Sequence, residues 1–330
     1  MRIFAILLLL LIVGIATWLV VGRPTTAVAA PAPTPASPPE TRDAGTLLTG
    51  PADAGILVIR HPRGESDNDQ RDVYHLALLR EALDRTSGTY GPYRLEPGPE
   101  VMNELLIMRK LEAGSPDIDL MVRPTSQVDE ARLEPIRIPL EKGLLGYRIC
   151  LIQAQDQARF SAIDGPAALS AVRLGQGRDW NDVSIYEANR MTVVTGANYE
   201  GLFEMLLRQR FDAFPRGVNE VFAEHAARVA SMPDLAIEKD LVIHYPFCRY
   251  AWVGKGPKGD QVRKRLTEGL EGMIQDGTFD RLFYRHHGQD IVRAELHRRR
   301  IIPLSNPHLP ATAPLARREL WFDPARPVPP

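Results

Sequence analysis

Residues 172–220 read VRLGQGRDWNDVSIYEANRMTVVTGANYEGLFEMLLRQRFDAFPRGVNE, and this stretch is the most informative part of the chain. An apolar strand runs into a glycine turn, Gly175-Gln176-Gly177, and then into a helix start. A second strand leads into a helix that opens with Tyr199, and a third ends at Phe214-Pro215-Arg216-Gly217. Because open α/β sheets bind ligands at the carboxyl ends of their strands, the three strand ends predict one ligand-binding edge.

The composition is that of an ordinary globular protein. The chain has 330 residues, of which 44% are hydrophobic and 25% charged, and its formal net charge is -1. That balance gives no bulk attraction to nucleic acid or anionic lipid, and we expect no nucleic-acid partner. The chain contains no common motif for nucleotide binding, zinc binding or a catalytic nucleophile, so we expect no cofactor, no metal and no catalytic residue.

The N-terminal residues have the layout of an export signal. Met1-Arg2 precedes an uncharged apolar run, 3–21, and small residues follow at 25–30. The run is nearly long enough to span a bilayer, so both a cleaved signal peptide and an uncleaved signal anchor over 1–30 remain open. Residues 31–54 are predicted to form a Pro/Ala-rich tether. The remainder is expected outside the cytoplasm, with membrane contact only through this segment.

The rest of the chain predicts two α/β lobes, the second inserted into the first. Apolar periodicity predicts strands at 55–60, 93–96, 117–122 and 147–152, helices at 73–85 and 102–113, and later helices at 259–277 and 279–287. A long apolar strand, 241–253, is expected to return the chain to lobe 1. We therefore predict lobe 1 at 55–146 and 254–330, including an irregular C-terminal strap, and lobe 2 at 147–253. Cys150 and Cys248 are expected in one sheet, where a disulfide and two buried thiols both remain open.

With these elements the chain resembles the type II extracytoplasmic (periplasmic) solute-binding proteins, in the polar amino-acid-binding (family 3) branch that serves ABC importers. The likeness covers about 55–287. It rests on Asp119 followed by Thr125, Ser126 and Arg132, on the glycine turn, and on the strand entry 207–213. It is closer to an uncharacterised subgroup with Gly-Gln-Gly-x-Asp-Trp and Phe-Pro-Arg-Gly-Val-Asn-Glu. The resemblance implies a two-lobed fold, each lobe a mainly parallel sheet with flanking helices.

The resemblance also implies ligand-binding residues. In the family an arginine equivalent to Arg132 clamps a carboxylate, the Thr125 or Ser126 hydroxyl assists, and the turn at Gly177 offers backbone N–H groups. Where the family places an Asp for the ligand ammonium, this chain has Arg216 or Gly217, which would favour an anion. The remaining candidates are Arg60 at the end of the first strand, Arg178, Asp179 and Trp180 beside the turn, and Asn219 in the next helix.

Each candidate also has a purely structural interpretation. Arg216 could form a salt bridge within its lobe, and Arg60 could be solvated. Asp179 could cap the next helix, and Trp180 could be a packing residue. Asn219 could cap the helix that follows Arg216.

These observations predict an exported, periplasmic protein that captures a small, anionic or carboxylate-bearing solute in an interlobe cleft. An inner-membrane ABC permease is the implied partner. One alternative is a dehydratase-like enzyme of the cyclohexadienyl dehydratase type, with Glu220 or Asp179 as the acid. Another is a ligand sensor module held at the membrane by an uncleaved N-terminal helix.

Overall fold

The computed structural model describes residues 55–63, 72–326 and 328, all of which fall within one compact unit, Pro51–Pro330. The predicted signal segment, 1–30, and tether, 31–54, lie outside the described residues. Within the described residues, no helix combines the length and the apolar character needed to cross a membrane.

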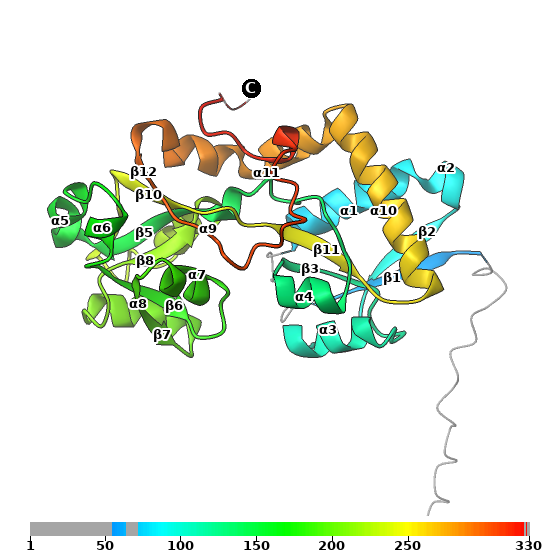
Figure 1. Ribbon diagram of the computed structural model, residues 1–330, viewed down its shortest axis with the longest axis horizontal. Coiled ribbons are helices and arrows are strands. Elements are labelled where there is room, and N and C mark those ends of the chain that lie inside the picture. Colours follow the sequence, from blue (N-terminus) through cyan, green and yellow to red (C-terminus); the bar gives the residue numbers. More distant parts are fainter. Residues whose placement is uncertain (1–54, 64–71, 327, 329–330) are drawn as a thin grey trace, which may run out of the picture. The chain divides into compact units, whose positions relative to one another are not determined.

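One group of elements forms the first lobe (Figure 1). Strand β1 (Leu57–His61) pairs in parallel with β2 (Tyr93–Pro97). Strand β11 (Arg249–Val253) pairs antiparallel with both β3 (Leu120–Pro124) and β4 (Pro135–Ile136). The two ladders meet where Asp119 accepts from the Arg60 N–H through Oδ2 at 2.7 Å and donates its own N–H to the Arg60 carbonyl. The helices of this lobe are α1 (Val73–Arg85), α2 (Ser87–Tyr90), α3 (Glu104–Glu112), α4 (Gln127–Arg132) and α10 (Pro257–Gln275).

The second lobe is built on β5 (Tyr147–Gln153), every residue of which is buried. Strand β5 pairs antiparallel with β8 (Phe214–Gly217), β9 (Leu235–Ile237) and β10 (Leu241–His244), and β10 is parallel to β12 (Arg300–Pro303). Strands β6 (Arg173–Gly177) and β7 (Thr192–Gly196) form a parallel pair. The helices here are α5 (Gln157–Ser161), α6 (Pro166–Leu169), α7 (Asp182–Ala188), α8 (Tyr199–Leu207) and α9 (Val218–Ala226), and α11 (Thr278–Ala294) contacts α9, α10 and α1.

The return crossing differs from the single strand expected at 241–253. It consists of β10 and β11, which lie in different sheets and are separated by residues 245–248. Pro246 lies in that gap and lacks the N–H that a continuous ladder would need. Strand β11 therefore belongs to the first-lobe sheet, although the expected second lobe ran to 253. Strand β12 belongs to the second-lobe sheet, although 254–330 was expected in lobe 1.

The strand directions are mixed. The parallel ladders expected from strand-helix-strand units are present at β1/β2 and β6/β7. The strands on either side of the crossings pair antiparallel instead, as β5 does with β8, β9 and β10. Cys150 and Cys248 are both buried free thiols, Cys150 in β5 and Cys248 just before β11 of the other sheet.

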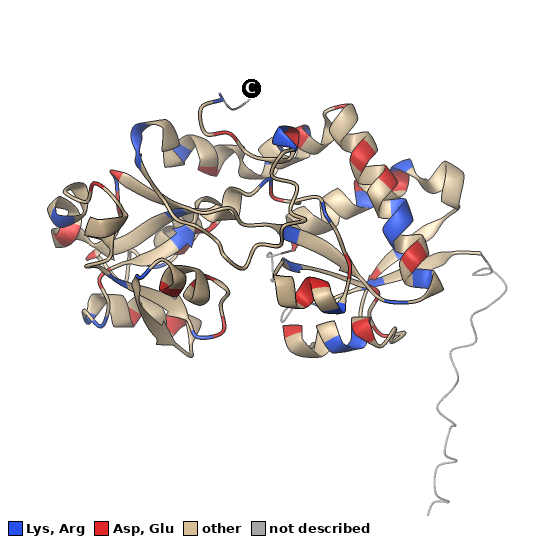
Figure 2. Ribbon diagram, in the orientation of Figure 1, with Lys and Arg blue, Asp and Glu red and all other residues tan. Residues whose placement is uncertain are grey.

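A continuous apolar core connects the two lobes. One buried cluster contains Ile59 and Leu83 of the first lobe together with Phe214 and Val221 of the second. Charged residues of both signs are interspersed along the helices and strands of both lobes (Figure 2). This distribution agrees with the absence of a net electrostatic drive toward polyanions.

Candidate functional site

Three parallel strand ends of the second lobe meet at one edge. Strands β6 and β7 pair in parallel, and the residue before β8, Ala213, forms a parallel bridge to Leu174 of β6. Each strand then runs into a helix: β6 into α7, β7 into α8, and β8 directly into α9. The edge predicted from residues 172–220 is thus assembled, with three helix N-termini beside it.

The glycine turn at this edge is closely packed. A Cβ on Gly177 would overlap the indole ring of Trp180, so only glycine fits there without a shift. The Trp180 ring is nearly parallel to that of Phe214, with centroids 6.1 Å apart. Trp180 is half-buried, so it packs within the lobe and also keeps part of its surface accessible. Its interpretation as a packing residue fits these contacts, and its ligand contact stays a prediction.

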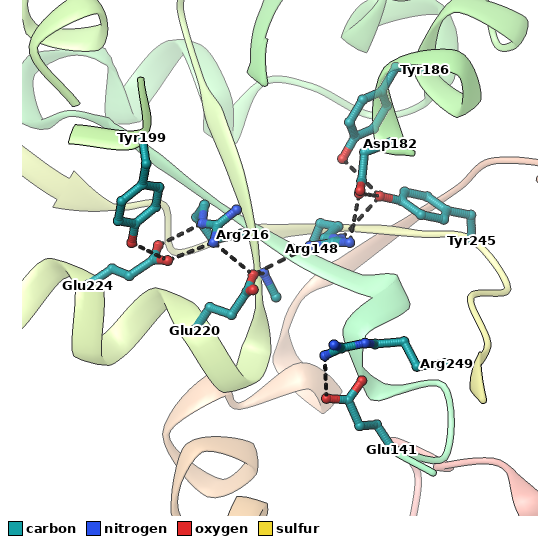
Figure 3. Close-up of polar contacts among 11 residues, drawn as sticks. Glu141, Arg148, Asp182, Tyr186, Tyr199, Arg216, Glu220, Glu224, Tyr245 and Arg249 are labelled. Atoms are coloured by element: carbon teal, nitrogen blue, oxygen red, sulfur yellow. Dashed lines mark hydrogen bonds and ion pairs between the residues drawn. The ribbon is translucent and has the colours of Figure 1, made fainter. Parts of the chain in front are cut away.

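Arg216 is buried and already paired (Figure 3). Its Nε and Nη2 each donate to a carboxylate oxygen of Glu224, both at 2.6 Å, in a bidentate pair. A Glu220 oxygen lies 3.2 Å from Nη2, and the guanidinium sits 4.8 Å from the Trp180 ring centroid. Burial opposes the charge, but the two carboxylates outweigh it and raise the pKa of Arg216. This is the lobe-internal salt bridge named above as the structural interpretation.

The same chain of charges continues to Arg148 at the start of β5 (Figure 3). Arg148 is buried, and its Nη2 lies 2.7 Å from Asp182 Oδ1 at the first position of α7. Its Nε donates to the Tyr245 hydroxyl at 3.1 Å, and that hydroxyl donates to Asp182. Glu220 joins the two arginines, because Oε2 also lies 3.5 Å from Arg148 Nη1.

Glu220 is held as a carboxylate by this arrangement. Burial favours its neutral form, but the charges of Arg216 and Arg148 and the N–H of Gly217 outweigh burial and lower its pKa. The Gly217 N–H donates to Oε2 at 2.8 Å. A carboxylate with a lowered pKa can accept hydrogen bonds but is a poor proton donor near neutral pH.

A second buried charge cluster lies beside the crossings (Figure 3). Glu141, which precedes β5, is buried and lies 3.4 Å from Arg249 Nη1 and 3.3 Å from His75 Nε2. Burial would raise the pKa of Glu141, but Arg249 and His75 lower it well below its usual range. Glu141 lies on the connection that leads to β5, and Arg249 is the first residue of β11, so this pair holds the start of β11 against that connection.

The predicted first-lobe residues are occupied by internal contacts. Arg60 donates from Nη1 to the Pro116 carbonyl at 3.1 Å. Thr125 is buried and donates to Glu130 at 2.8 Å, and Ser126 caps α4 by accepting from the Asp129 N–H at 3.1 Å. Arg132 lies at the end of that helix and pairs with Glu112 of α3 at 2.7 Å. Their roles as ligand contacts stay predictions.

The other second-lobe candidates have fewer contacts. Arg178 and Asp179 are exposed. The N-cap of α7 is Asn181, so Asp179 is not the cap of that helix, and the N-cap of α9 is Gly217, so Asn219 does not cap α9.

Two carboxamides at this edge have polar atoms without partners. Asn219 is half-buried, and its Oδ1 is buried and accepts no hydrogen bond from the part of the chain that the structure describes. Gln176, which sequence reasoning did not single out, is 1% exposed, and within the same described part neither carboxamide atom has a partner. Native structures rarely leave such atoms unpaired.

The sequence offered signals for some of the residues that were missed. Glu224 stands four residues after Glu220, so both lie on one face of the helix that follows Arg216. Gln176 is a polar residue between two glycines in a strand of four buried residues out of five. Arg148, Asp182 and Tyr245 come from distant segments and carry no local signal. Among the described residues, no group of His, Cys, Asp and Glu is arranged to hold a metal ion.

Comparison with known proteins gives structural likeness at low identity. A crystal structure from Bacillus subtilis has 16% identity, a TM-score of 0.48, and covers 72% of this chain and 92% of its own. An ancestral arginine-binding protein bound to arginine has 16% identity, a TM-score of 0.48, and coverages of 70% and 98%. An amino acid ABC transporter substrate-binding protein from Streptococcus pneumoniae bound to L-arginine has 12% identity, a TM-score of 0.47, and coverages of 72% and 95%. No protein-family model and no curated protein matches the chain. The fold is therefore described from the strand order of this chain alone.

Proposed function

We propose that this chain is an exported solute-binding protein that takes a small molecule at the carboxyl edge of β6, β7 and β8. The observation that carries the proposal is the meeting of three parallel strand ends with three helix starts at one edge. The two connections between the lobes, with Glu141 on one and Arg249 directly after the other, are the elements about which the lobes would close on the solute.

Two unpaired carboxamides support a polar solute at this edge. The buried Gln176 carboxamide and the Asn219 Oδ1 atom lie in β6 and in the first turn of α9. Leaving a buried polar atom unpaired costs about 1–3 kcal/mol. These atoms have almost no accessible surface, so a solute would recover this cost only after the surrounding side chains rearrange. Amides both donate and accept, so they suit a solute that carries both kinds of group.

The charge of the solute is a separate question. The preference for an anion rested on Arg132, Arg178 and Arg216, but Arg132 pairs with Glu112 and Arg216 with Glu224. Only Arg178 of these three has no side-chain partner within the described residues, and it is exposed. A screen must therefore include anionic, zwitterionic and cationic solutes.

A thermal-shift screen of amino acids and small organic acids tests the proposal. A bound solute raises the melting temperature by mass action. Trp180→Ala and Asn219→Ala should reduce that shift, because both residues lie at the proposed edge. Arg298→Ala is the matched control, since within the described residues this exposed side chain pairs only with Glu295, one turn away. The proposal is wrong if no solute stabilises the protein, or if the control and the edge variants respond alike.

The dehydratase alternative has less support from the geometry. It requires a protonated carboxyl group, and the pKa of Glu220 is lowered by Arg216 and Arg148, which together outweigh its burial. The other candidate acid, Asp179, is exposed. Turnover of prephenate by the purified protein would revive this alternative.

Export, periplasmic location and an ABC permease as partner complete the proposal, and they rest on the sequence of residues 1–30 and on the family resemblance. N-terminal sequencing of the mature protein separates a free carrier, which would begin near Ala30, from a tethered sensor that retains Met1.

A further inference from the structure

The C-terminal segment 300–322, here called the strap, is anchored to the second lobe at its beginning. Strand β12 pairs with β10 over Arg300–Pro303. Ser305 then makes three hydrogen bonds with Asn189, which directly follows α7. Its N–H and its hydroxyl donate to Oδ1 at 3.0 and 3.2 Å, and its carbonyl accepts from Nδ2 at 2.7 Å.

Farther along, the strap is anchored to the first lobe. The His308 carbonyl accepts from the Gln127 N–H of α4 at 3.2 Å. Thr312 donates to Glu130 of the same helix at 2.9 Å. Arg317 then makes a bidentate pair with Glu271 of α10, at 2.6 and 2.9 Å.

The strap also contacts the two connections between the lobes. Asn306 donates from Nδ2 to the carbonyl of Pro246 at 3.0 Å, in the gap between β10 and β11. The Phe322 N–H donates to the Lys142 carbonyl at 2.7 Å, just before β5. Trp321 lies against Gly143, where φ is 70° and a Cβ would meet the indole ring. The strap therefore reaches both lobes and both connections.

We propose that the strap is a latch that limits rotation of one lobe against the other. The last contact of the strap with the second lobe is at Ser305, and its first contact with the first lobe is at His308. Three residue steps separate these two residues, and they span at most about 11 Å when fully extended. Pro307 lies between them with a fixed φ. A rotation that carries Asn189 away from Gln127 must therefore break an anchor once this short link is extended.

The latch deepens the proposed function and rests on it, because a solute that enters between the lobes needs them to separate. Its test needs no solute, so the two ideas can fail independently.

Spin labels on Arg208→Cys of the second lobe and Leu105→Cys of the first report the distance between lobes by pulsed electron resonance. Their side chains are exposed, whereas the native Cys150 and Cys248 are buried. Asn189→Ala removes the Ser305 anchor and leaves the β12–β10 pairing in place, so the free link between the lobes becomes longer. Thr312→Val removes a second first-lobe contact, the hydrogen bond to Glu130, and leaves the His308 anchor intact.

Asn189→Ala frees Ser305, so the latch predicts that this variant broadens the distance distribution toward longer values, and that adding Thr312→Val broadens it further. Arg298→Ala changes an exposed arginine that pairs only with the nearby Glu295 in the part of the chain that the structure describes, so it should leave the distribution unchanged. The proposal is overturned if folded latch variants give the distribution of the Arg298→Ala control. Circular dichroism establishes folding, and Asn189→Ala alone carries the test if the double variant does not fold.

Discussion

The buried Arg216–Glu224 pair makes the sharpest stability prediction. Glu224→Gln keeps the shape of the side chain but removes its charge. The side chains of Arg216 and Glu224 are 7% and 12% exposed, so the guanidinium would lose its bidentate partner with little access to water. Removing one member of a buried ion pair costs roughly 3–5 kcal/mol, because the other charge is left uncompensated.

The structure places the expected cost at the lower end of that range, about 3 kcal/mol. Arg216 would keep Glu220 at 3.2 Å and the Trp180 ring at 4.8 Å. The matched control is Glu112→Gln, which breaks the Arg132–Glu112 pair, where the side chains are 35% and 32% exposed. Exposed pairs contribute about 0–1 kcal/mol, so the two variants should differ by about 2 kcal/mol.

Urea unfolding, followed by circular dichroism at neutral pH, measures both free energies of unfolding. The double variant Arg216→Met/Glu224→Leu should recover most of the loss, because apolar replacement of both partners leaves no stranded charge. Equal losses for Glu224→Gln and Glu112→Gln would refute the assignment of Arg216 as a buried, internally paired cation. An unrecovered double variant would mean that packing, not charge, dominates at this position.

Two further predictions concern pH and close packing. Burial lowers the pKa of His244 to about 4, against an unfolded value near 6.5. Between those values the unfolded chain binds more protons, so stability is complete above about pH 6.5 and falls by about 3 kcal/mol as the pH drops toward 4. His244→Gln should flatten that slope in urea titrations, and an unchanged slope would contradict the assignment. Gly146→Ala should lower the free energy of unfolding by about 1–3 kcal/mol, because its Cβ would overlap the Tyr245 carbonyl oxygen. Gly165→Ala is the control, since a Cβ there would meet no atom within 4 Å, and its melting temperature should be unchanged.

Local patterns predicted the elements well. Apolar periodicity gave the first helix at 73–85, the bounds that α1 has, and the start of α8 at Tyr199. These features depend on residues three and four apart, which a single sequence displays directly.

Pairing between distant segments could not be predicted in the same way. The apolar run 241–253 has the composition of one strand, but its halves pair with β5 and β12 on one side and with β3 and β4 on the other. Only the partner strands, more than 90 residues earlier or about 60 later, decide which sheet each half joins. The role of 300–303 as a strand of the second lobe was hidden for the same reason.

At the candidate site, the sequence predicted the position of Arg216 in the fold but not the groups that pair with it. The sequence placed Arg216 at a strand end, and the structure has it there, in β8. Its charge, however, belongs to a network in which two arginines, Arg148 and Arg216, face three carboxylates of Asp182, Glu220 and Glu224. The network has one carboxylate more than it has cations, so it offers no unbalanced positive charge to a solute. An anionic solute at this edge would need its positive partner elsewhere, and the exposed Arg178, which follows Gly177, is one candidate. The number of arginines at a strand edge therefore does not by itself predict the charge of the solute. The carboxylates that pair with those arginines must be counted as well.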